Sequence, residues 1–224
     1  MKATLGVVLA GGGSRRFGSP KAGAELQGRS LMDHALDRLE AAGVAKVGIV
    51  ASHTGSVPGW EPVRSVEVRR DGAPDLGPLE GLRVALAWAR ELDLAGVLVL
   101  PVDLPLVSPG LLRHLVAERA PGWQAVVPQS DGPRGYEPLC AWYSADLLEA
   151  VNTAMAEGAH APAHLLERVS CHRVPLAVVA RFGDPEIQFL NVNRPDALER
   201  AREMADSVAA DGVSPQPTQP RSAG

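Results

Sequence analysis

The stretch TLGVVLAGGGSRRFGSPK, residues 4–21, carries the clearest indication of the fold. Residues 4–10 form a continuous apolar run rich in β-formers, which predicts a buried central strand of a parallel sheet. The run ends at three consecutive glycines, Gly11 to Gly13, which allow the chain to turn tightly there. Ligand sites of open α/β sheets lie beyond the carboxyl ends of their strands. The stretch therefore predicts an α/β protein with its site after the first strand.

The rest of the chain alternates between helix and strand patterns. Apolar residues at helical spacing over 31–42 end at Gly43, a usual helix stop, and an apolar strand pattern over 46–51 completes one βαβ unit. We expect further strands over 66–69, 96–101, 124–127, 139–143 and 190–193. We expect further helices over 79–89, 111–116, 145–156, 163–169 and 196–209, the last with Pro195 in its first turn.

Length and composition indicate one domain with an aliphatic core. The chain has 224 residues, 46% of them hydrophobic but only 4% aromatic, so Ala, Val and Leu must fill the interior. We assign residues 1–210 to a single domain. Residues 211–224 are rich in Pro, Ser and Gln with almost no apolar content, and this composition predicts a disordered C-terminal tail.

Charge and cysteine content narrow the class of ligand and the compartment. A net charge of −4 provides no broad basic field for a nucleic-acid backbone, so a small phosphorylated ligand is favoured. Cys140 and Cys171 have no CxxC spacing and indicate reduced thiols. The apolar run that ends at Ala10 is too short to cross a membrane. We therefore expect a cytoplasmic protein that binds neither nucleic acid nor membrane.

The glycine-rich loop has the chemistry of a phosphate cradle. Its glycines can present backbone N–H groups to an anion, and Arg15, Arg16 and Lys21 add positive charge to the same turn. The alternative is a plain strand-to-helix turn with solvated arginines. Three glycines and three cations in one turn favour a site for a triphosphate.

The spacing within this loop excludes two better-known phosphate loops. A P-loop that contains Gly13 would need Lys after Gly18, where the chain has Ser19. A GxGxxG motif would need glycine at Arg16. The loop therefore argues against both a P-loop kinase and a simple dinucleotide-binding enzyme.

Asp103 is the candidate metal ligand. It follows the predicted strand 96–101 and lies between Pro101 and Pro105, which restrict the local backbone. Mg²⁺ commonly takes one or two protein carboxylates and completes its shell with phosphate oxygens and water. One rigid carboxylate beside a triphosphate would suffice, although an aspartate after a strand can also be a helix cap or a turn residue.

Two further pairs of polar residues are weaker candidates. Asp71 and Asp75 precede the segment GPLEGL and could face a base or ribose, or favour the positive end of the following helix. Asn191 and Asn193 alternate along a predicted strand, so both would point to one side and could reach a ligand together. A capping or turn role is equally compatible with the two asparagines.

Five segments in this order resemble the molybdenum cofactor guanylyltransferases: LAGGGSRRFGSPK, GPLEGL, LPVDLPLVSP, EPLCAWYS and FLNVNRPDALERA. The resemblance spans residues 4–204. It implies a doubly wound, Rossmann-like, mostly parallel sheet of the nucleotidyltransferase type (GT-A-like). It also implies an enzyme that joins GMP from GTP to the terminal phosphate of molybdopterin carrying molybdenum, with release of pyrophosphate.

The resemblance also implies roles for individual residues. Nucleotide binding falls to Leu9, Ala10, Gly11, Gly12, Lys21, Asp71 and Asp103; the Mg²⁺ ligand is Asp103; the pterin-side residues are Asn191 and Asn193. The expected reaction is in-line attack of a substrate phosphate oxygen on the α-phosphorus, without a covalent enzyme intermediate. Arg16 and Lys21 would stabilise the departing pyrophosphate, while Mg²⁺ on Asp103 would orient the α-phosphate.

The choice of base depends on two motifs. Relatives that transfer CMP usually carry LAAG in place of LAGG and lack GPLxG, so Gly11 and the segment GPLEGL favour guanine. The chain departs from the usual guanylyl pattern at Pro20 and at Ser52-His53, which keeps a cytidylyltransferase for the same pterin open.

Other acceptors and a non-catalytic role are also open. Sugar- and alditol-phosphate nucleotidyltransferases share the loop and differ in the acceptor. A nucleotide-binding cofactor chaperone could keep the loop and lose the chemistry, although the presence of both Lys21 and Asp103 argues against it. A molybdoenzyme chaperone is a further partner that the resemblance suggests.

Overall fold

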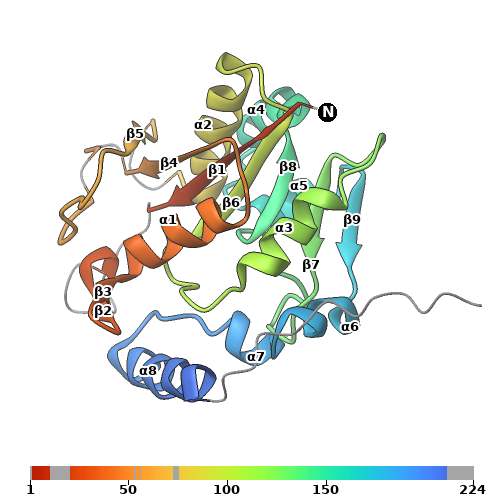
Figure 1. Cartoon of the computed structure of the whole chain (residues 1–224). Helices are drawn as coiled ribbons and strands as arrows, with labels where there is room; N and C mark the ends of the chain where they lie inside the picture. The colour runs from red at the N-terminus through yellow and green to blue at the C-terminus, as the bar shows by residue number, and fades with distance from the viewer. Residues whose placement is uncertain (1, 11–20, 53, 56, 73–75, 211–224) are drawn as a thin grey trace, which may run out of the picture.

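A computed structural model describes residues 2–10, 21–52, 54–55, 57–72 and 76–210 of the chain (Figure 1). The expected tail, residues 211–224, lies outside the described residues. In the described part of the chain, no helix combines the length and the apolar character needed to cross a membrane.

The main sheet has seven strands among the described residues, in the order β5-β4-β1-β6-β8-β7-β9. Its strands are β1 Thr4–Leu9, β4 Lys46–Ala51, β5 Glu67–Arg70, β6 Gly96–Pro101, β7 Ala125–Pro128, β8 Ala141–Ser144 and β9 Cys171–Val174. β1, β4, β5 and β6 are mutually parallel, whereas β8 runs antiparallel to both of its neighbours. The sheet is therefore mostly parallel, as the resemblance implied.

Helices cover both faces of this sheet (Figure 1). They are α1 Leu31–Ala41, α2 Pro78–Glu91, α3 Pro109–Ala117, α4 Leu148–Ala156, α5 Pro162–Leu166, α6 Leu176–Val179, α7 Pro185–Gln188 and α8 Pro195–Ala210. Successive residues of β1 point to opposite faces. Val7 packs with α2 and α4, and Val8 packs with α1 and α3. Both faces of β1 are buried, which explains its unbroken apolar sequence.

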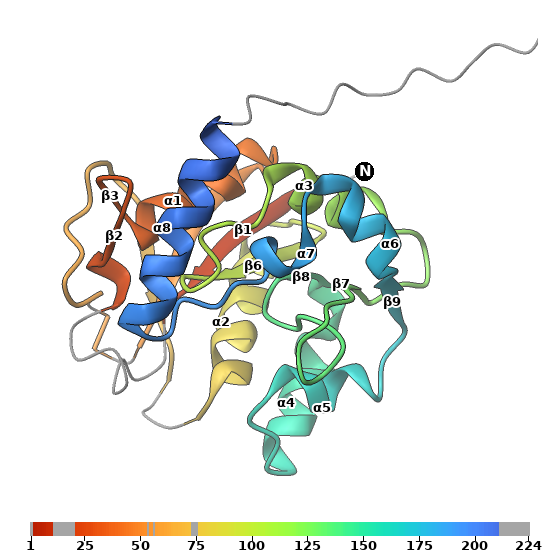
Figure 2. The ribbon, with the colours of Figure 1, turned by 90° about the horizontal axis from the view of Figure 1, so that it is seen from below.

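Short elements connect the larger ones near the end of β1. A 3₁₀ turn, η1 Lys21–Gly23, leads into a small hairpin formed by β2 Glu25–Leu26 and β3 Arg29–Ser30. α8 packs on this hairpin in a third apolar cluster that joins Leu198 and Ala201 to Leu26 and Val192 (Figure 2). Two more 3₁₀ turns are η2 Ala145–Leu147 and η3 Ala180–Phe182. The two-residue strands of the hairpin are too short to give a clear pattern in sequence.

Most of the predicted elements are confirmed within about two residues at each end, the usual uncertainty of helix and strand boundaries. The side chain of Ser30 accepts the Asp33 N–H and so starts α1, and Ser108 caps α3 through the Leu111 N–H. The strand expected over 190–193 is wrong. Only one backbone bond, from Val192 N–H to Asp103 O at 2.9 Å, joins this segment to the loop after β6, so no ladder forms.

A candidate nucleotide and metal site at the sheet edge

The carboxyl ends of β1, β4 and β6 meet at one edge of the sheet. Leu9, the last residue of β1, is in register with Val50 of β4 and with Pro101 of β6. The Ala10 N–H donates to Val50 O at 2.9 Å and continues the ladder by one residue. The structure thus places Leu9, Ala10 and the loop after β6 at a common edge, as the sequence predicted. Gly11, Gly12 and Arg16 lie outside the described residues.

Lys21 and Asp103 are in contact at this edge. Lys21 opens η1, and its Nζ lies 2.8 Å from Oδ2 of Asp103. The side chains are only 12% and 18% exposed, so the ion pair is largely shielded from water. The Lys21 ammonium also donates to Oδ1 of Asn193. Three predicted site residues from three distant segments therefore meet.

Asn193 reaches Lys21 from a segment that wraps the loop after β6. Val192 is buried and its N–H donates to Asp103 O at 2.9 Å, while Asn193 N–H donates to Asn191 O in a tight turn at 3.0 Å. Both asparagines are exposed. They open on a hollow of about 760 Å³ lined by Leu190, Asn191, Asn193, Arg194, Asp196, Ala197 and Arg200.

Asp71 lies at the same edge but two strands away from the end of β1. It directly follows β5, and its N–H donates to Ala51 O at the end of β4 at 2.9 Å. In the strand order, β4 and β1 lie between the ends of β5 and β6. Asp71 and Asp103 therefore lie on opposite sides of the end of β1.

Glu80 is a buried carboxylate that sequence reasoning missed. It lies in the first turn of α2, is 2% exposed, and accepts the N–H of Gly72 at 2.9 Å and two bonds from Arg83 at 2.6 and 2.8 Å. Burial alone would raise the pKa of Glu80, but the hydrogen bonds and charge of Arg83 and the Gly72 N–H outweigh it and lower the pKa. The Glu80 side chain therefore holds Gly72, the residue after Asp71, in place. The signal in sequence was an acidic residue early in a helix, which alone does not reveal this contact.

Glu137, in the segment EPLCAWYS, is a second missed carboxylate. Its Oε1 accepts the hydroxyl of Ser130 at 2.7 Å. Burial raises its pKa against the effect of this hydrogen bond, and the negative charge of Asp103 raises it further. Glu137 therefore belongs to the electrostatic surroundings of Asp103.

The donor set suits a magnesium ion brought with a nucleotide better than a closed protein cage. Within the described ranges, no group of three or more His, Cys, Asp or Glu side chains is arranged to hold a metal. The Asp103 carboxylate is a hard oxygen ligand at the sheet edge, and Mg²⁺ needs only one or two such ligands when phosphates and water complete its shell. Asp103 therefore fits the role of a single protein ligand.

Comparison with known proteins agrees with this geometry. The family model for the MobA-like NTP transferase domain matches residues 6–174. The molybdenum cofactor guanylyltransferase of Xanthomonas euvesicatoria pv. vesicatoria (strain 85-10) is 34% identical over 197 residues, which cover 87% of this chain and 92% of that protein.

Two solved structures extend the comparison. Molybdopterin-guanine dinucleotide biosynthesis protein A from Archaeoglobus fulgidus is similar with a TM-score of 0.74 and 27% identity, covering 91% of this chain and 100% of that one. A Mycobacterium tuberculosis H37Rv protein solved in complex with manganese shares the fold, with a TM-score of 0.62, 20% identity, and coverage of 90% and 98%. The chain therefore belongs to the MobA-like NTP transferase family and, within it, to the molybdenum cofactor guanylyltransferases.

Proposed function

We propose that this nucleotidyltransferase transfers GMP from GTP to molybdopterin carrying molybdenum and releases pyrophosphate. The observation that carries the proposal is the contact between Lys21 and Asp103, because it joins a cation suited to a phosphate to a carboxylate suited to Mg²⁺, beyond the end of β6. Membership of a family whose relatives are named guanylyltransferases supports the choice of GTP.

In this proposal the nucleotide lies along the sheet edge between Asp71 and Asp103. Leu9 and Ala10, with Gly11 and Gly12, would contact the guanine and the triphosphate. Asp71 would contact the nucleoside end of GTP, where Glu80 fixes the adjoining Gly72 N–H. This arrangement leaves the phosphates beside Lys21, which stands on the β6 side of the edge.

Asp103 would hold Mg²⁺, which supplies Lewis-acid charge neutralisation at the phosphates. Lys21, together with Arg16, would stabilise the charge that grows on the departing pyrophosphate. The same ammonium is hydrogen-bonded to Asp103 and to Asn193, and these contacts would orient it beside the metal ligand and the acceptor. Such pre-orientation lowers the reorganisation needed in the transition state.

The acceptor would enter from the side of Asn191 and Asn193. The hollow beside them is open, carries the guanidinium groups of Arg194 and Arg200, and is suited in size and charge to a phosphorylated pterin. We assign these roles to residues 1–210 as one cytoplasmic domain. A molybdoenzyme chaperone would be a downstream partner.

The decisive experiment measures pyrophosphate release by the purified full chain with GTP or CTP, Mg²⁺, and pterin with or without molybdenum. We expect release with GTP and the molybdenum-loaded pterin, accompanied by formation of the guanine dinucleotide cofactor. A preference for CTP would identify a cytidylyltransferase for the same pterin. Release only with a sugar or alditol phosphate would identify another acceptor, and GTP binding without any release would indicate a non-catalytic chaperone.

A further inference from the structure

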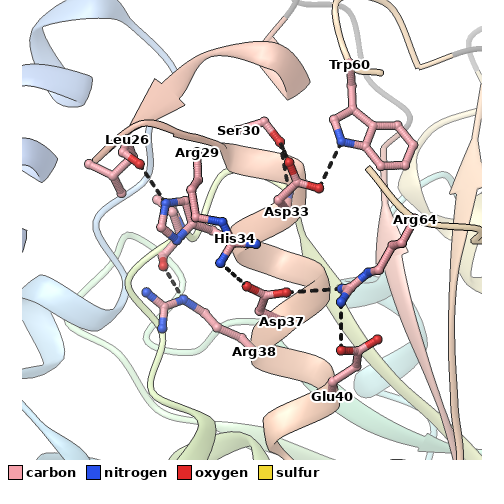
Figure 3. Close-up of polar contacts among 11 residues, drawn as sticks. Leu26, Arg29, Ser30, Asp33, His34, Asp37, Arg38, Glu40, Trp60 and Arg64 are labelled. Atoms are coloured by element: carbon pink, nitrogen blue, oxygen red, sulfur yellow. Dashed lines mark hydrogen bonds and ion pairs between the residues drawn. The ribbon is translucent and has the colours of Figure 1, made fainter. Parts of the chain in front are cut away.

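One face of α1 is tied to the two loops that carry the candidate catalytic pair. His34 and Arg38 are four residues apart and therefore lie one turn apart on the same side of the helix (Figure 3). His34 hydrogen-bonds a backbone carbonyl of the hairpin after Lys21, and Arg38 hydrogen-bonds one in the loop after β6. α1 therefore contacts both segments of the site, although neither His34 nor Arg38 is itself one of the candidate catalytic residues.

His34 holds the hairpin that follows the Lys21 turn. Its Nε2 lies 2.8 Å from Leu26 O in β2. Burial lowers the pKa of His34, so the ring is neutral near pH 7 and Nε2 must carry the hydrogen that meets the carbonyl. The Leu31 N–H, at the start of α1, donates to Ala24 O at 2.9 Å and closes the same hairpin. The segment after Lys21 is therefore fixed to α1 at two points.

Arg38 holds the loop that carries Asp103. Its Nε donates to Pro105 O, two residues beyond Asp103. This contact is partly buried, and burial lowers the pKa of the Arg38 guanidinium to about 10. On the other side of the loop, Val192 N–H donates to Asp103 O at 2.9 Å. The loop is thus held between α1 and the segment before α8.

The loop is stiff enough that the hydrogen bond at Pro105 O also restrains the Asp103 carboxylate. Pro101 and Pro105 lock one backbone dihedral each, so the short segment between them has little freedom to absorb a displacement. Leu104 N–H donates to Pro101 O at 3.4 Å, which adds a turn inside the segment. Movement at Pro105 O would therefore move Asp103 as well.

We propose that His34 and Arg38 are positioning residues: through Leu26 O and Pro105 O they set the relative placement of Lys21 and Asp103. The chemical meaning of this placement rests on the proposed function, in which the pair binds a metal and phosphate. The placement itself is a property of α1 and can be tested by Mn²⁺ binding in the presence of a GTP analogue, without any turnover.

Glutamine and methionine make a matched pair of substitutions at Arg38. In Arg38→Gln the amide nitrogen stands where Nε stood, so the donor is kept and the charge is lost. In Arg38→Met a methyl group takes that place, so both are lost. Arg38→Lys keeps the charge but has carbon at the position of Nε. The same Gln and Met pair serves His34, because the glutamine nitrogen reaches as far as Nε2.

The control is Arg113→Met. Arg113 also donates from its guanidinium to a backbone carbonyl, Ala41 O, at 2.6 Å, but this lies at the opposite end of α1 from the hairpin and on the exposed surface. The substitution Arg113→Met therefore removes the same kind of hydrogen bond, but one that does not involve either segment of the site.

The primary readout is Mn²⁺ affinity, measured by electron paramagnetic resonance with a non-hydrolysable GTP analogue bound. Urea unfolding and pyrophosphate release are measured on the same samples. We expect Arg38→Met to weaken Mn²⁺ binding about tenfold, the effect of losing one hydrogen bond from a charged donor, whereas Arg38→Gln and Arg113→Met stay near the wild type. Arg38→Lys should bind Mn²⁺ less tightly than Arg38→Gln. His34→Met should weaken binding of the GTP analogue about fivefold, and His34→Gln should restore it.

Several outcomes would overturn the inference. Equal Mn²⁺ affinity in Arg38→Gln and Arg38→Met would show that the Nε hydrogen bond does not position Asp103. If Arg38→Met does not fold, Arg38→Lys decides, because tighter Mn²⁺ binding in Arg38→Lys than in Arg38→Gln would assign the effect to charge alone. A wild type that binds Mn²⁺ but releases no pyrophosphate would contradict the proposed function. The Mn²⁺ affinities of the Arg38 variants would still test the positioning role.

Discussion

Lys21 Nζ lies 2.8 Å from Asp103 Oδ2, although 82 residues separate the two in the chain. The contact differs from the surface pair of Lys2 and Asp93, whose side chains are 60% and 83% exposed. Exposed pairs contribute little because water and salt screen them, whereas a shielded pair interacts more strongly. Each partner at the site therefore helps to fix the position of the other.

Removal of the Asp103 charge should abolish turnover and leave the fold in place. Asp103→Asn keeps the shape of the side chain but removes the negative ligand, and Asp103→Ala removes the group altogether. We expect pyrophosphate release to fall by at least about 100-fold in both, the usual cost of losing one electrostatic element of a transition state. Circular dichroism would show whether the fold is intact. Asp93→Asn, which breaks the surface pair, should be fully active, and full activity of Asp103→Ala would refute the metal assignment.

Glu80→Gln should weaken GTP binding and destabilise the protein. The carboxylate accepts three hydrogen bonds from Arg83 and Gly72, and a neutral amide cannot accept all of them. We expect a loss of about 2 kcal/mol in urea unfolding and a raised KM for GTP, because the turn next to Asp71 loosens. The matched control is Glu199→Gln, which breaks an exposed pair with Arg202 at the same helical spacing. An unchanged KM in Glu80→Gln would separate this turn from the nucleotide.

The contribution of Glu80 should depend on pH in a defined direction. Its pKa is lowered in the folded state from an ordinary value of 4.5, so its stabilising effect is complete above that value and is lost as the pH falls through the folded pKa. The difference in unfolding free energy between the wild type and Glu80→Gln should be constant from about pH 7 to pH 5 and shrink below about pH 4.5. Taking this difference cancels the titration of other groups, including Glu137. A difference that grows on acidification would contradict the assignment.

Gly23→Ala should disturb the Lys21 turn because the added methyl has no room. A Cβ on Gly23 would lie 1.7 Å from the backbone oxygen of Gly59. Because the clash is with backbone, the rotation of a side chain cannot relieve it. Overpacking of this kind costs about 1–3 kcal/mol, and we expect activity to fall with it. Thermal unfolding provides the measurement. Gly81→Ala is the control for stability, since its Cβ would meet Leu9 at an ordinary 3.4 Å and alanine favours a helix; equal stability of the two variants would disprove the steric argument.

Much of the fold followed from local patterns. β1 and β6 are unbroken apolar runs because both faces of each strand are covered, and α1 has the spacing of a helix with one buried side. The same patterns failed for residues 190–193, where alternation reflected a buried Val192 between two exposed asparagines and not a strand. β9 at the sheet edge is partly exposed and carried too weak a signal to be predicted.

Local patterns predicted the strand β1 that leads into the glycine-rich segment, the carboxylate that follows β6, and most of the strands and helices around them, because these features depend on periodicity and turn chemistry. Which side chains meet at this edge of the sheet depends instead on tertiary packing. Asn193 contacts Lys21 across 172 residues, Arg38 reaches Pro105 O across 67, and Glu80 bonds to the backbone next to Asp71. Such contacts depend on the order of strands and the packing of α1, α2 and α8 against them, which no local pattern specifies.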